Sequence, residues 1–234
     1  MSATTRRSHR AVMQANPWFS AMQRGHRDAL LAASEQLHLR RGAMLFRQGD
    51  PVGAAGSGFY GLAAGAIKTS TLRSDGREAI LGILEPGNWF GEVSLIDGAP
   101  RTHDATALSA ATVLVVSPEA FQHQMRDAAF ANAVAALLAT RVRALYGMIE
   151  DAALRSLRAR VASRLILLAR GGPTLLAHAR ASITVSQEAL AMMLGISRQT
   201  LSIELNVLAR EGAIALGYRR IDITSMEALR AAAH

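Results

Sequence analysis

Residues 37–117 constrain the fold most, because short apolar runs alternate there with turn-forming segments. The runs LHL, MLF, AIKTSTL, AILGIL and ATVLVV have the length and alternation of strands. Between them stand QGDP, RSDGR, EPGN and DGAP, which are rich in the residues that form turns. Short strands at this spacing indicate a β-sandwich, roll or barrel. Residues 52–58 are small and glycine-rich, and we expect a loop there.

Helical patterns flank this β region on both sides. Residues 1–36 predict a loose basic tail and then a helix that begins at Asn16, with Pro17 at its first position. Leu30, Leu31 and Leu37 are expected to form the apolar face of that helical part. Ser117 repeats the start pattern, since a proline and an acidic residue follow it.

A long helix is predicted over residues 127–156, and two apolar stripes run along it. One stripe is spaced like a coiled-coil seam, which favours pairing with a second copy of the chain. Its members are Leu138, Val142, Leu145, Ile149 and Ala152. The second stripe is expected to pack against the β domain, and its members are Phe130, Val134, Leu137, Ala144 and Met148. The alternative is a single helix buried in its own core.

Composition excludes several classes of protein. The chain has 234 residues, half of them hydrophobic, which excludes a disordered chain. It has no cysteine, so disulfides and a thiolate-bound iron–sulfur cluster are excluded. There is no run of 18 uninterrupted apolar residues and no apolar signal core at the start. We therefore expect a cytoplasmic protein with no membrane partner.

The net charge of +8 is concentrated at the two ends of the chain. Residues 1–41 carry seven arginines against two acidic residues, and residues 142–234 carry twelve against seven, so each segment has a net charge of +5. The middle segment has seven basic and nine acidic residues, a net charge of −2. A basic C-terminal third indicates a polyanion partner, most often nucleic acid.

Residues 157–234 predict a helix-turn-helix followed by a β-hairpin. A helix after Ser156 ends at Gly171-Gly172-Pro173, and residues 175–182 indicate a loop or weak hairpin. Ser186 caps the next helix, whose buried face is Ala189, Leu190, Met193 and Leu194. Gly195 makes the turn, and Ser197 caps a second helix with Leu201, Leu205 and Leu208 pointing inward. The run IALGYRRIDI then indicates a hairpin with a basic tip, or wing.

This arrangement predicts contacts with double-stranded DNA. Arg198 and Gln199 face outward at the start of the second helix, where arginine can read guanine and glutamine adenine. The contacts that set register on the DNA backbone are assigned to Ser197, Thr200, Arg219 and Arg220. Ser186, Gln187 and Ser202 complete the predicted DNA-binding set. The alternative is an ordinary helical hairpin with exposed polar residues.

GISRQTLSIELNVLAREGAIALGYRRIDI resembles the winged helix-turn-helix of bacterial Crp/Fnr transcription regulators. AMLFRQGDP…FYGLAAGAIKTST…DGREAILGILEPGNWFGEVSLIDGAPRT resembles their cyclic-nucleotide-binding β-roll. The resemblance implies an α+β chain. Its parts are a tail and helix over 1–36, a double-stranded β-helix or jelly roll over 37–126, a dimerisation helix over 127–156 and a DNA-binding domain over 157–234.

The same resemblance implies an effector site in the roll. Gly91, Glu92 and Val93 match a phosphate-binding cassette, in which backbone N–H groups meet a phosphate and Glu92 accepts from a ribose hydroxyl. Arg101 would neutralise the phosphate and Thr102 would add a hydroxyl. The alternative for Glu92 and Arg101 is a buried ion pair that holds the roll together.

The long helix supplies the other side of that implied pocket. Arg141 falls where cyclic-AMP-responsive members carry a pocket-facing arginine. Leu145 and Tyr146 fall where those members place small hydroxyl residues near the adenine. The phosphate half of a cyclic-nucleotide site is therefore kept, whereas the base half departs from the pattern.

The leading hypothesis is a homodimeric regulator that binds a palindromic DNA site under the control of a nucleotide-like effector, with RNA polymerase as a further partner. The second hypothesis is an effector-independent regulator whose roll serves only dimerisation. An enzyme with Glu92 as base lacks a nucleophile, a metal cluster and a second acid, so we assign no catalytic or metal-binding residue. Haem through His26, His38 or His103, and a metal at His103-Asp104, are weaker alternatives to polar surface.

Overall fold

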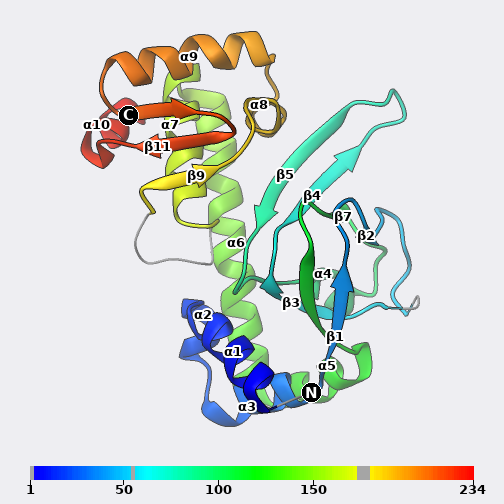
Figure 1. The fold of residues 1–234 in the computed structure, drawn as a ribbon. Helices are drawn as coiled ribbons and strands as arrows, with labels where there is room; N and C mark the ends of the chain where they lie inside the picture. Colours follow the sequence, from blue (N-terminus) through cyan, green and yellow to red (C-terminus); the bar gives the residue numbers. More distant parts are fainter. Residues whose placement is uncertain (1–2, 54–55, 173–179) are drawn as a thin grey trace. The chain divides into compact units, whose positions relative to one another are not determined.

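Two four-stranded antiparallel sheets form the centre of the first half of the chain. The computed structural model describes residues 3–53, 56–172 and 180–234, and the chain divides into two units, Met1–Ala139 and Thr140–His234 (Figure 1). One sheet has the order β1 (Ser34–Leu39), β8 (Ala111–Val116), β3 (Phe59–Ala64), β6 (Trp89–Phe90). The other has the order β2 (Met44–Phe46), β7 (Asp104–Ala107), β4 (Ile67–Leu72), β5 (Glu78–Leu84). Strands β1, β2, β4, β5 and β8 fall on the runs that the sequence predicted, whereas β3, β6 and β7 were not predicted.

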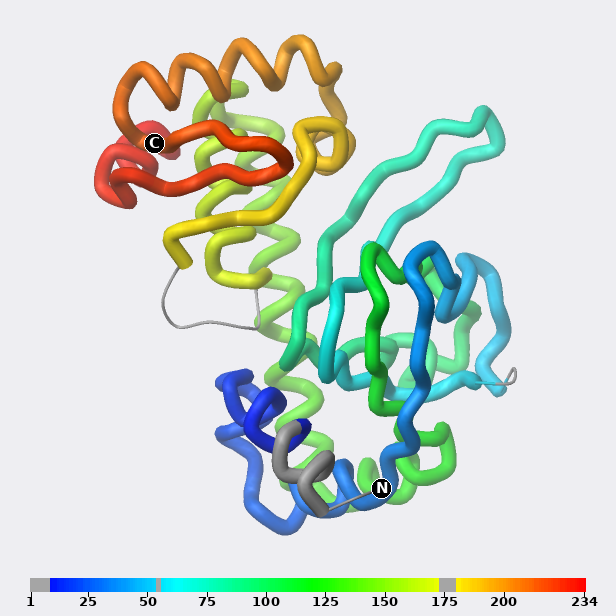
Figure 2. Tube along the Cα trace, viewed as in Figure 1, coloured from blue at the N-terminus to red at the C-terminus, as the bar shows by residue number. Residues whose placement is uncertain are grey.

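The core between the sheets takes alternate residues from both of them. Its buried members are Phe46, Tyr60, Leu62, Ile67, Phe90, Ala105, Ala107, Ala111 and Val113. Because side chains on a strand alternate between faces, each sheet buries one face here. The β-roll expected from the sequence is therefore confirmed, and Figure 2 allows its chain path to be followed from blue to green.

Helices cover the outer face of the sheet that contains β3. They are α1 (Ala3–Gln14), α2 (Pro17–Ala21), α3 (Arg24–Ala32), α5 (Pro118–Met125) and the start of α6 (Ala128–Leu154). Their contact with the sheet is an aromatic cluster around Trp89, whose ring stacks on those of Phe19 and Phe59 with centroid separations of 5.6 and 5.1 Å. Asn16 caps α2 as predicted, accepting hydrogen bonds from the N–H groups of Trp18 and Phe19.

Two expectations for the N-terminal part were wrong. The segment before Asn16 is not a loose tail, because residues 3–14 form α1, and Met13 of this helix is completely buried. Leu37 does not continue a helical face, since it lies in β1 opposite Val113. The alternating run SEQLHL pairs with β8 instead, which satisfies its backbone groups in a ladder.

The long helix α6 buries only its first part. Phe130, Val134 and Leu137 are buried in the aromatic cluster, as predicted for the second stripe. The prediction was wrong for the rest of that stripe, because Ala144 and Met148 are only half-buried and the sulfur of Met148 contacts Arg164 of the following helix. By length and composition alone α6 could cross a membrane, but these buried residues are those of a core helix. In the predicted dimerisation stripe, Leu138 is half-buried and the four later residues are exposed.

In the part that the structure describes, the second unit contains four helices after α6, around a small sheet. After α7 (Leu157–Ala169) come β9 (Ser182–Thr184), α8 (Gln187–Leu194), α9 (Arg198–Arg210), β10 (Ile214–Gly217), β11 (Arg220–Ile223) and α10 (Met226–Ala232). The sheet order is β10-β11-β9. Strand β9 was not predicted, and the expected loop over 175–182 falls mostly outside the described residues. The glycine stop after α7 is confirmed, since Gly171 and Gly172 have φ values of 73° and 97°.

Packing in this unit centres on α9. Leu201, Leu205 and Leu208 have no exposed surface, as predicted. In α8 the sequence placed Ala189 inside, but Ala189 is half-buried and Ala191 is the buried alanine. Two arginines of α7 hold the C-terminal end of α8. Arg160 donates to the carbonyl of Leu194 at 3.0 Å, and Arg164 donates to that of Met193 at 3.4 Å.

Candidate functional site

Serine caps and one glycine fix the start of the two helices in the helix-turn-helix. The Ser186 hydroxyl accepts the N–H of Ala189 at 3.1 Å, and the Ser197 hydroxyl accepts that of Thr200 at 3.0 Å. Between the helices Gly195 has φ 68°, a left-handed conformation that ends α8 and allows the tight turn. Each predicted cap is therefore confirmed, and together they fix where α9 begins.

The first turn of α9 presents polar side chains to solvent. Arg198 and Gln199 are exposed, whereas Thr200 and Ser202 are half-buried. The hydroxyls of Ser197 and Thr200 lie 2.8 Å apart and form a hydrogen bond. The end of α9 that enters a major groove in a helix-turn-helix thus carries one long cationic and one long amide side chain.

A groove of about 440 Å³ joins this helix end to the hairpin. Its lining includes four residues that the sequence assigned to DNA, namely Ser186, Gln187, Arg198 and Arg219. The remaining lining residues are Val185, Glu188, Gly217, Tyr218 and Ile221. The sequence prediction did not include Tyr218. Its signal was an aromatic residue beside a glycine at the tip of a predicted hairpin.

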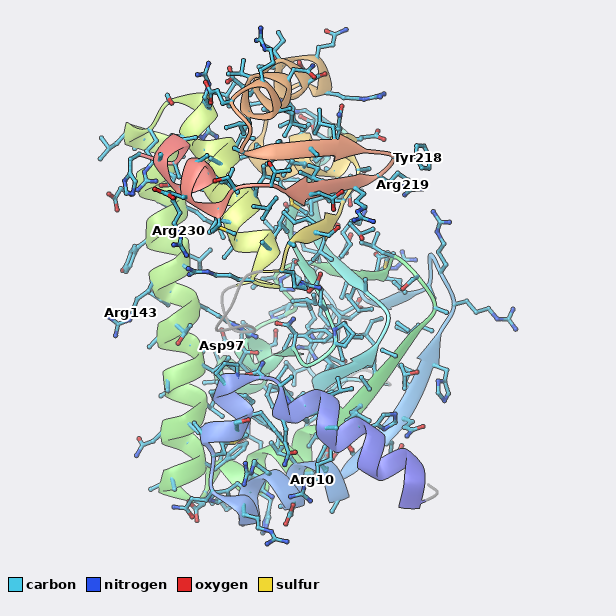
Figure 3. All side chains as sticks on the ribbon, turned by 60° about the vertical axis from the view of Figure 1, so that its left-hand side comes forward. Arg10, Asp97, Arg143, Tyr218, Arg219 and Arg230 are labelled. Atoms are coloured by element: carbon cyan, nitrogen blue, oxygen red, sulfur yellow. The ribbon has the colours of Figure 1, made fainter. Side chains whose placement is uncertain are left out.

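The two arginines at the hairpin tip have different surroundings. Gly217 pairs with Arg220, so only Tyr218 and Arg219 form the loop. Arg219 has φ 54°, and its side chain and that of Tyr218 point away from the hairpin (Figure 3). Arg220 is instead ion-paired, since its Nε lies 2.7 Å from Oδ1 of Asp222. This hydrogen bond lowers the pKa of the Asp222 carboxyl.

The cassette predicted in the roll begins at a constrained glycine. Gly91 has φ 91°, and a Cβ placed on it would lie 2.7 Å from the ring of Tyr60. Glycine is therefore required for both its backbone conformation and its small size. The short helix α4 (Glu92–Asp97) starts at the next residue, and Glu92 is completely buried there. Val93, the next position of the cassette, is 40% exposed.

Arg101 lies inside the roll, only 4% exposed. Its guanidinium donates to the carbonyl of Gly91 at 2.7 Å and to that of Gly58 at 3.1 Å. The same group lies over two aromatic rings, 4.6 Å from the centroid of Phe46 and 5.4 Å from that of Tyr60. The pKa of the Tyr60 hydroxyl is raised by burial, which the nearby arginine only partly opposes. The structure thus brings Arg101 into direct contact with the predicted cassette.

The residues that follow Arg101 are more exposed. Thr102 is exposed, with its hydroxyl 2.8 Å from Nδ1 of His103. The side chain of Asp104 accepts the N–H of Gln48 at 2.7 Å, so this carboxylate supports the neighbouring loop. Among the described residues, no group of three or more histidine, aspartate and glutamate side chains is placed to hold a metal ion.

The other residues assigned to the effector lie on α6 in the second unit. Arg141 is half-buried, whereas Leu145 and Tyr146 are 56% and 68% exposed. Their part in an effector pocket stays a prediction. The histidines considered for haem have protein neighbours. His26 lies 3.4 Å from a carboxylate oxygen of Asp127, and His38 lies 3.2 Å from the hydroxyl of Thr112.

A β-roll with this cassette, followed by a winged helix-turn-helix, defines a DNA-binding regulator with a cyclic-nucleotide-binding domain. Residues 36–128 match the family described as cyclic nucleotide-binding domain, and residues 159–232 match the Crp-like helix-turn-helix domain. The two matches fall on the two parts of the chain that carry the cassette and the groove.

Whole-length relatives agree with these matches. The chain is 30% identical over 211 residues to a CRP-like cAMP-activated global transcriptional regulator of Mycobacterium tuberculosis, covering 86% of this chain and 90% of the relative. It is 30% identical to the cyclic AMP receptor protein of Thermus thermophilus, covering 90% and 94%. A CRP-family regulator of T. thermophilus with a solved structure is also 30% identical, with a TM-score of 0.65 and coverage of 84% and 96%. The chain belongs to the Crp/Fnr family of transcription regulators.

Proposed function

We propose that this regulator binds a two-fold-symmetric DNA site as a homodimer, with a cyclic nucleotide at the roll cassette as its effector. The observation that carries the DNA part is the groove between α9 and the hairpin, because it gathers Gln187, Arg198 and Arg219 on one surface. These side chains suit both base edges and phosphates. A regulator of this kind would act in the cytoplasm, on RNA polymerase.

The homodimer is supported by the exposed stripe on α6. Val142, Leu145 and Ile149 are 44%, 56% and 64% exposed. A row of large apolar side chains at coiled-coil spacing loses its contact with water when a second copy of the helix packs on it. Two paired helices would place two α9 helices about one DNA turn apart, which accounts for a two-fold site.

The effector part rests on Gly91, Glu92, Arg101 and Thr102. Arg101 and Gly91 are in contact, Glu92 is buried at the next position after Gly91, and Thr102 is exposed. Two of the relatives are named for cyclic AMP. Val93, Arg141, Leu145 and Tyr146 are the remaining proposed effector residues. Leu145 and Tyr146 differ from the small hydroxyl residues that cyclic-AMP-responsive members place near the adenine, so the base of the effector is not assigned.

One observation favours the second candidate, a regulator that needs no effector. The guanidinium of Arg101 already binds the carbonyls of Gly58 and Gly91 and covers two rings. A buried cation satisfied in this way stabilises the roll without a ligand. A phosphate would have to share or replace these contacts.

Selection of duplexes from a random library tests the DNA-binding part. We expect a motif with two-fold symmetry, and sedimentation of the unbound protein should show a dimer. Arg198→Ala should relax the preference at one base pair of each half-site, whereas Arg219→Ala should lower affinity evenly across sequences. Arg230→Ala, an exposed charge on α10, is the control and should change neither (Figure 3). A selected motif with no symmetry would contradict the dimeric proposal.

Calorimetry with cyclic AMP, cyclic GMP and cyclic dinucleotides tests the effector. We expect saturable binding of one of these, weakened about fivefold in Thr102→Ala, because one hydroxyl contact contributes about 1 kcal/mol. Thr102 suits this test since its side chain is exposed and the roll does not depend on it. Failure of all three ligands to bind, together with unaltered selection of DNA, would support the effector-independent regulator.

A further inference from the structure

Tyr218 is 93% exposed, more than any other large apolar or aromatic residue that the structure describes. It lies at the tip of a two-residue loop, and its ring points away from the hairpin (Figure 3). An aromatic residue in such a position gains little from the fold of its own domain. Exposed aromatic side chains of this kind mark surfaces that contact a partner.

The surroundings of Tyr218 indicate nucleic acid as that partner. Tyr218 lines the same groove as Gln187, Arg198 and Arg219. The domain carries a net charge of +5 over residues 142–234, with twelve arginines against seven acidic residues. The charged residues that line the groove are Arg198, Arg219 and Glu188, so its lining has a net charge of +1. A groove with net positive charge and an aromatic residue at its edge fits a sugar–phosphate strand better than an apolar protein surface.

The position of the groove then fixes which side of the DNA strand Tyr218 meets. A recognition helix in the major groove has, beside its N-terminus, the sugar–phosphate strand that borders that groove. The groove lies at this end of α9, since Arg198 of α9 lines it together with Tyr218 and Arg219 of the hairpin tip. One strand separates the major groove from the minor groove. A hairpin tip on the far side of the strand therefore faces the minor groove.

We propose that Tyr218 enters the minor groove next to each half-site and reads A·T against G·C pairs there. Its ring would pack on deoxyribose, and its hydroxyl would donate to N3 of adenine or O2 of thymine. A G·C pair places the 2-amino group of guanine in this path, and that group is a donor. The proposal rests on the DNA-binding function of the chain and adds a second, minor-groove site to it.

The hairpin is built to hold the tyrosine at its tip. Arg219 has a left-handed backbone at φ 54°, which is costly for a residue with a side chain. Arg220 is held by Asp222 at 2.7 Å, so it anchors the strand directly after the loop. Of the three residues after Gly217, only Tyr218 combines ordinary backbone geometry with a side chain that is almost entirely exposed.

The test uses the full chain and a duplex selected by it from a random library. The base pairs that flank each half-site are set to A·T, to G·C or to inosine·cytosine. Inosine·cytosine keeps the major-groove pattern of G·C but lacks the amino group in the minor groove. We expect G·C flanks to weaken wild-type binding about tenfold and inosine·cytosine flanks to restore it.

Three variants separate the contributions of the ring, the hydroxyl and the charge. Tyr218→Phe should keep most of the affinity for A·T flanks and lose most of the discrimination. Tyr218→Ala should lose both. Arg219→Gly relieves the left-handed backbone and removes the charge, so it should weaken binding to all flanks equally. Circular dichroism of each variant should match that of the wild type, because these side chains are exposed.

Several outcomes would overturn the proposal. One is an affinity for duplexes with inosine·cytosine flanks that is as low as the affinity for G·C flanks, since that result places the contact in the major groove. Another is a Tyr218→Ala variant that binds all duplexes like the wild type but fails to activate transcription with purified RNA polymerase, since the tyrosine would then dock a protein. If the wild-type chain selects no motif at all, the DNA-binding function itself fails. A selected motif that is indifferent to its flanks removes only the role of Tyr218.

Discussion

The roll and the DNA-binding surface use arginine in opposite ways. Arg101 is 4% exposed, and its guanidinium binds two backbone carbonyls and covers two rings. Arg198 stands at the start of α9 with its side chain in solvent. The first arginine joins the backbone just before β3 to the backbone just after β6, and the second is exposed and available to a partner. The same residue type therefore serves internal stability in one unit and recognition in the other.

Among the variants that test this difference between the two arginines, Arg101→Ala should change the free energy of unfolding most. The substitution leaves the carbonyls of Gly58 and Gly91 without their buried donor, so the free energy of unfolding of the roll should fall by about 3 kcal/mol. Urea denaturation followed by tryptophan fluorescence measures it. Both tryptophans of the chain, Trp18 and Trp89, lie in the first unit, so this signal reports the roll alone.

Arg198→Ala is the matched control for this measurement. It removes an exposed arginine from the other unit and should change the stability of the roll by less than about 0.5 kcal/mol. An Arg101→Ala variant as stable as this control would mean that the buried arginine does not hold the roll. The contrast between the two units would then be lost.

A second, smaller effect compares two serine caps. Ser117 and Ser197 each accept the N–H of the residue three positions later, at 3.2 and 3.0 Å. Loss of such a cap costs about 1 kcal/mol. Ser117→Ala should lower the stability of the roll by this amount and leave DNA binding unchanged. Ser197→Ala should leave the tryptophan signal unchanged and weaken DNA binding about fivefold, because it loosens the start of α9.

Fluorescence melts and titrations with the selected duplex measure the two effects side by side. Equal losses of DNA affinity in the two serine variants would contradict the separation between the roll and the DNA-binding surface. It would show that the start of α5 contributes to recognition as much as the start of α9.

The smallest effect concerns two aspartate–arginine pairs at hairpin turns. In the roll, Nε of Arg77 lies 2.7 Å from Oδ2 of Asp75, and at the wing Nε of Arg220 lies 2.7 Å from Oδ1 of Asp222. Each hydrogen bond lowers the pKa of its aspartate. Arg220→Ala should raise the pKa of Asp222 toward the ordinary value and leave that of Asp75 unchanged, and Arg77→Ala should do the reverse.

Carbon-13 NMR titration of the aspartate carboxyl groups measures these shifts. An aspartate with a lowered pKa stabilises the fold above its unfolded-state pKa, and this contribution is lost as the pH falls through the folded-state pKa. The variants should therefore lose a small part of this acid-sensitive stabilisation. An Asp222 pKa that is unaltered in Arg220→Ala would show that the wing pair does not persist in solution.

Local chemistry was the part of the fold that the sequence predicted well. The sequence identified four helix caps, Asn16, Ser117, Ser186 and Ser197. A short polar side chain directly before a helical apolar pattern most often caps the helix by accepting a backbone N–H. The inward leucines of α9 followed from the helical period in the same way. Strand β9 was missed because its three residues are too short to show a period, and its pairing with β11 is set by the tertiary structure.

The side-chain contacts inside the roll site could not be predicted from residue patterns. The motif placed Arg101 near Gly91, which the structure confirms through a direct hydrogen bond. It did not predict the rings of Phe46 and Tyr60, which come from β2 and β3, far from Arg101 along the chain. Such contacts depend on the register of paired strands, which a single sequence does not encode locally.

Gly91 also sets how freely this part of the chain can vary. Gly98, at the other end of α4, has φ 71° and open space where a Cβ would stand. A residue that tolerates left-handed geometry, such as asparagine, fits there at small cost. At Gly91 both the Tyr60 ring and the Gly58 carbonyl oxygen occupy that space, and the φ of 91° is a further cost, so a change of Tyr60 alone would not make room for a side chain. Position 91 is therefore restricted to glycine, whereas position 98 can change alone.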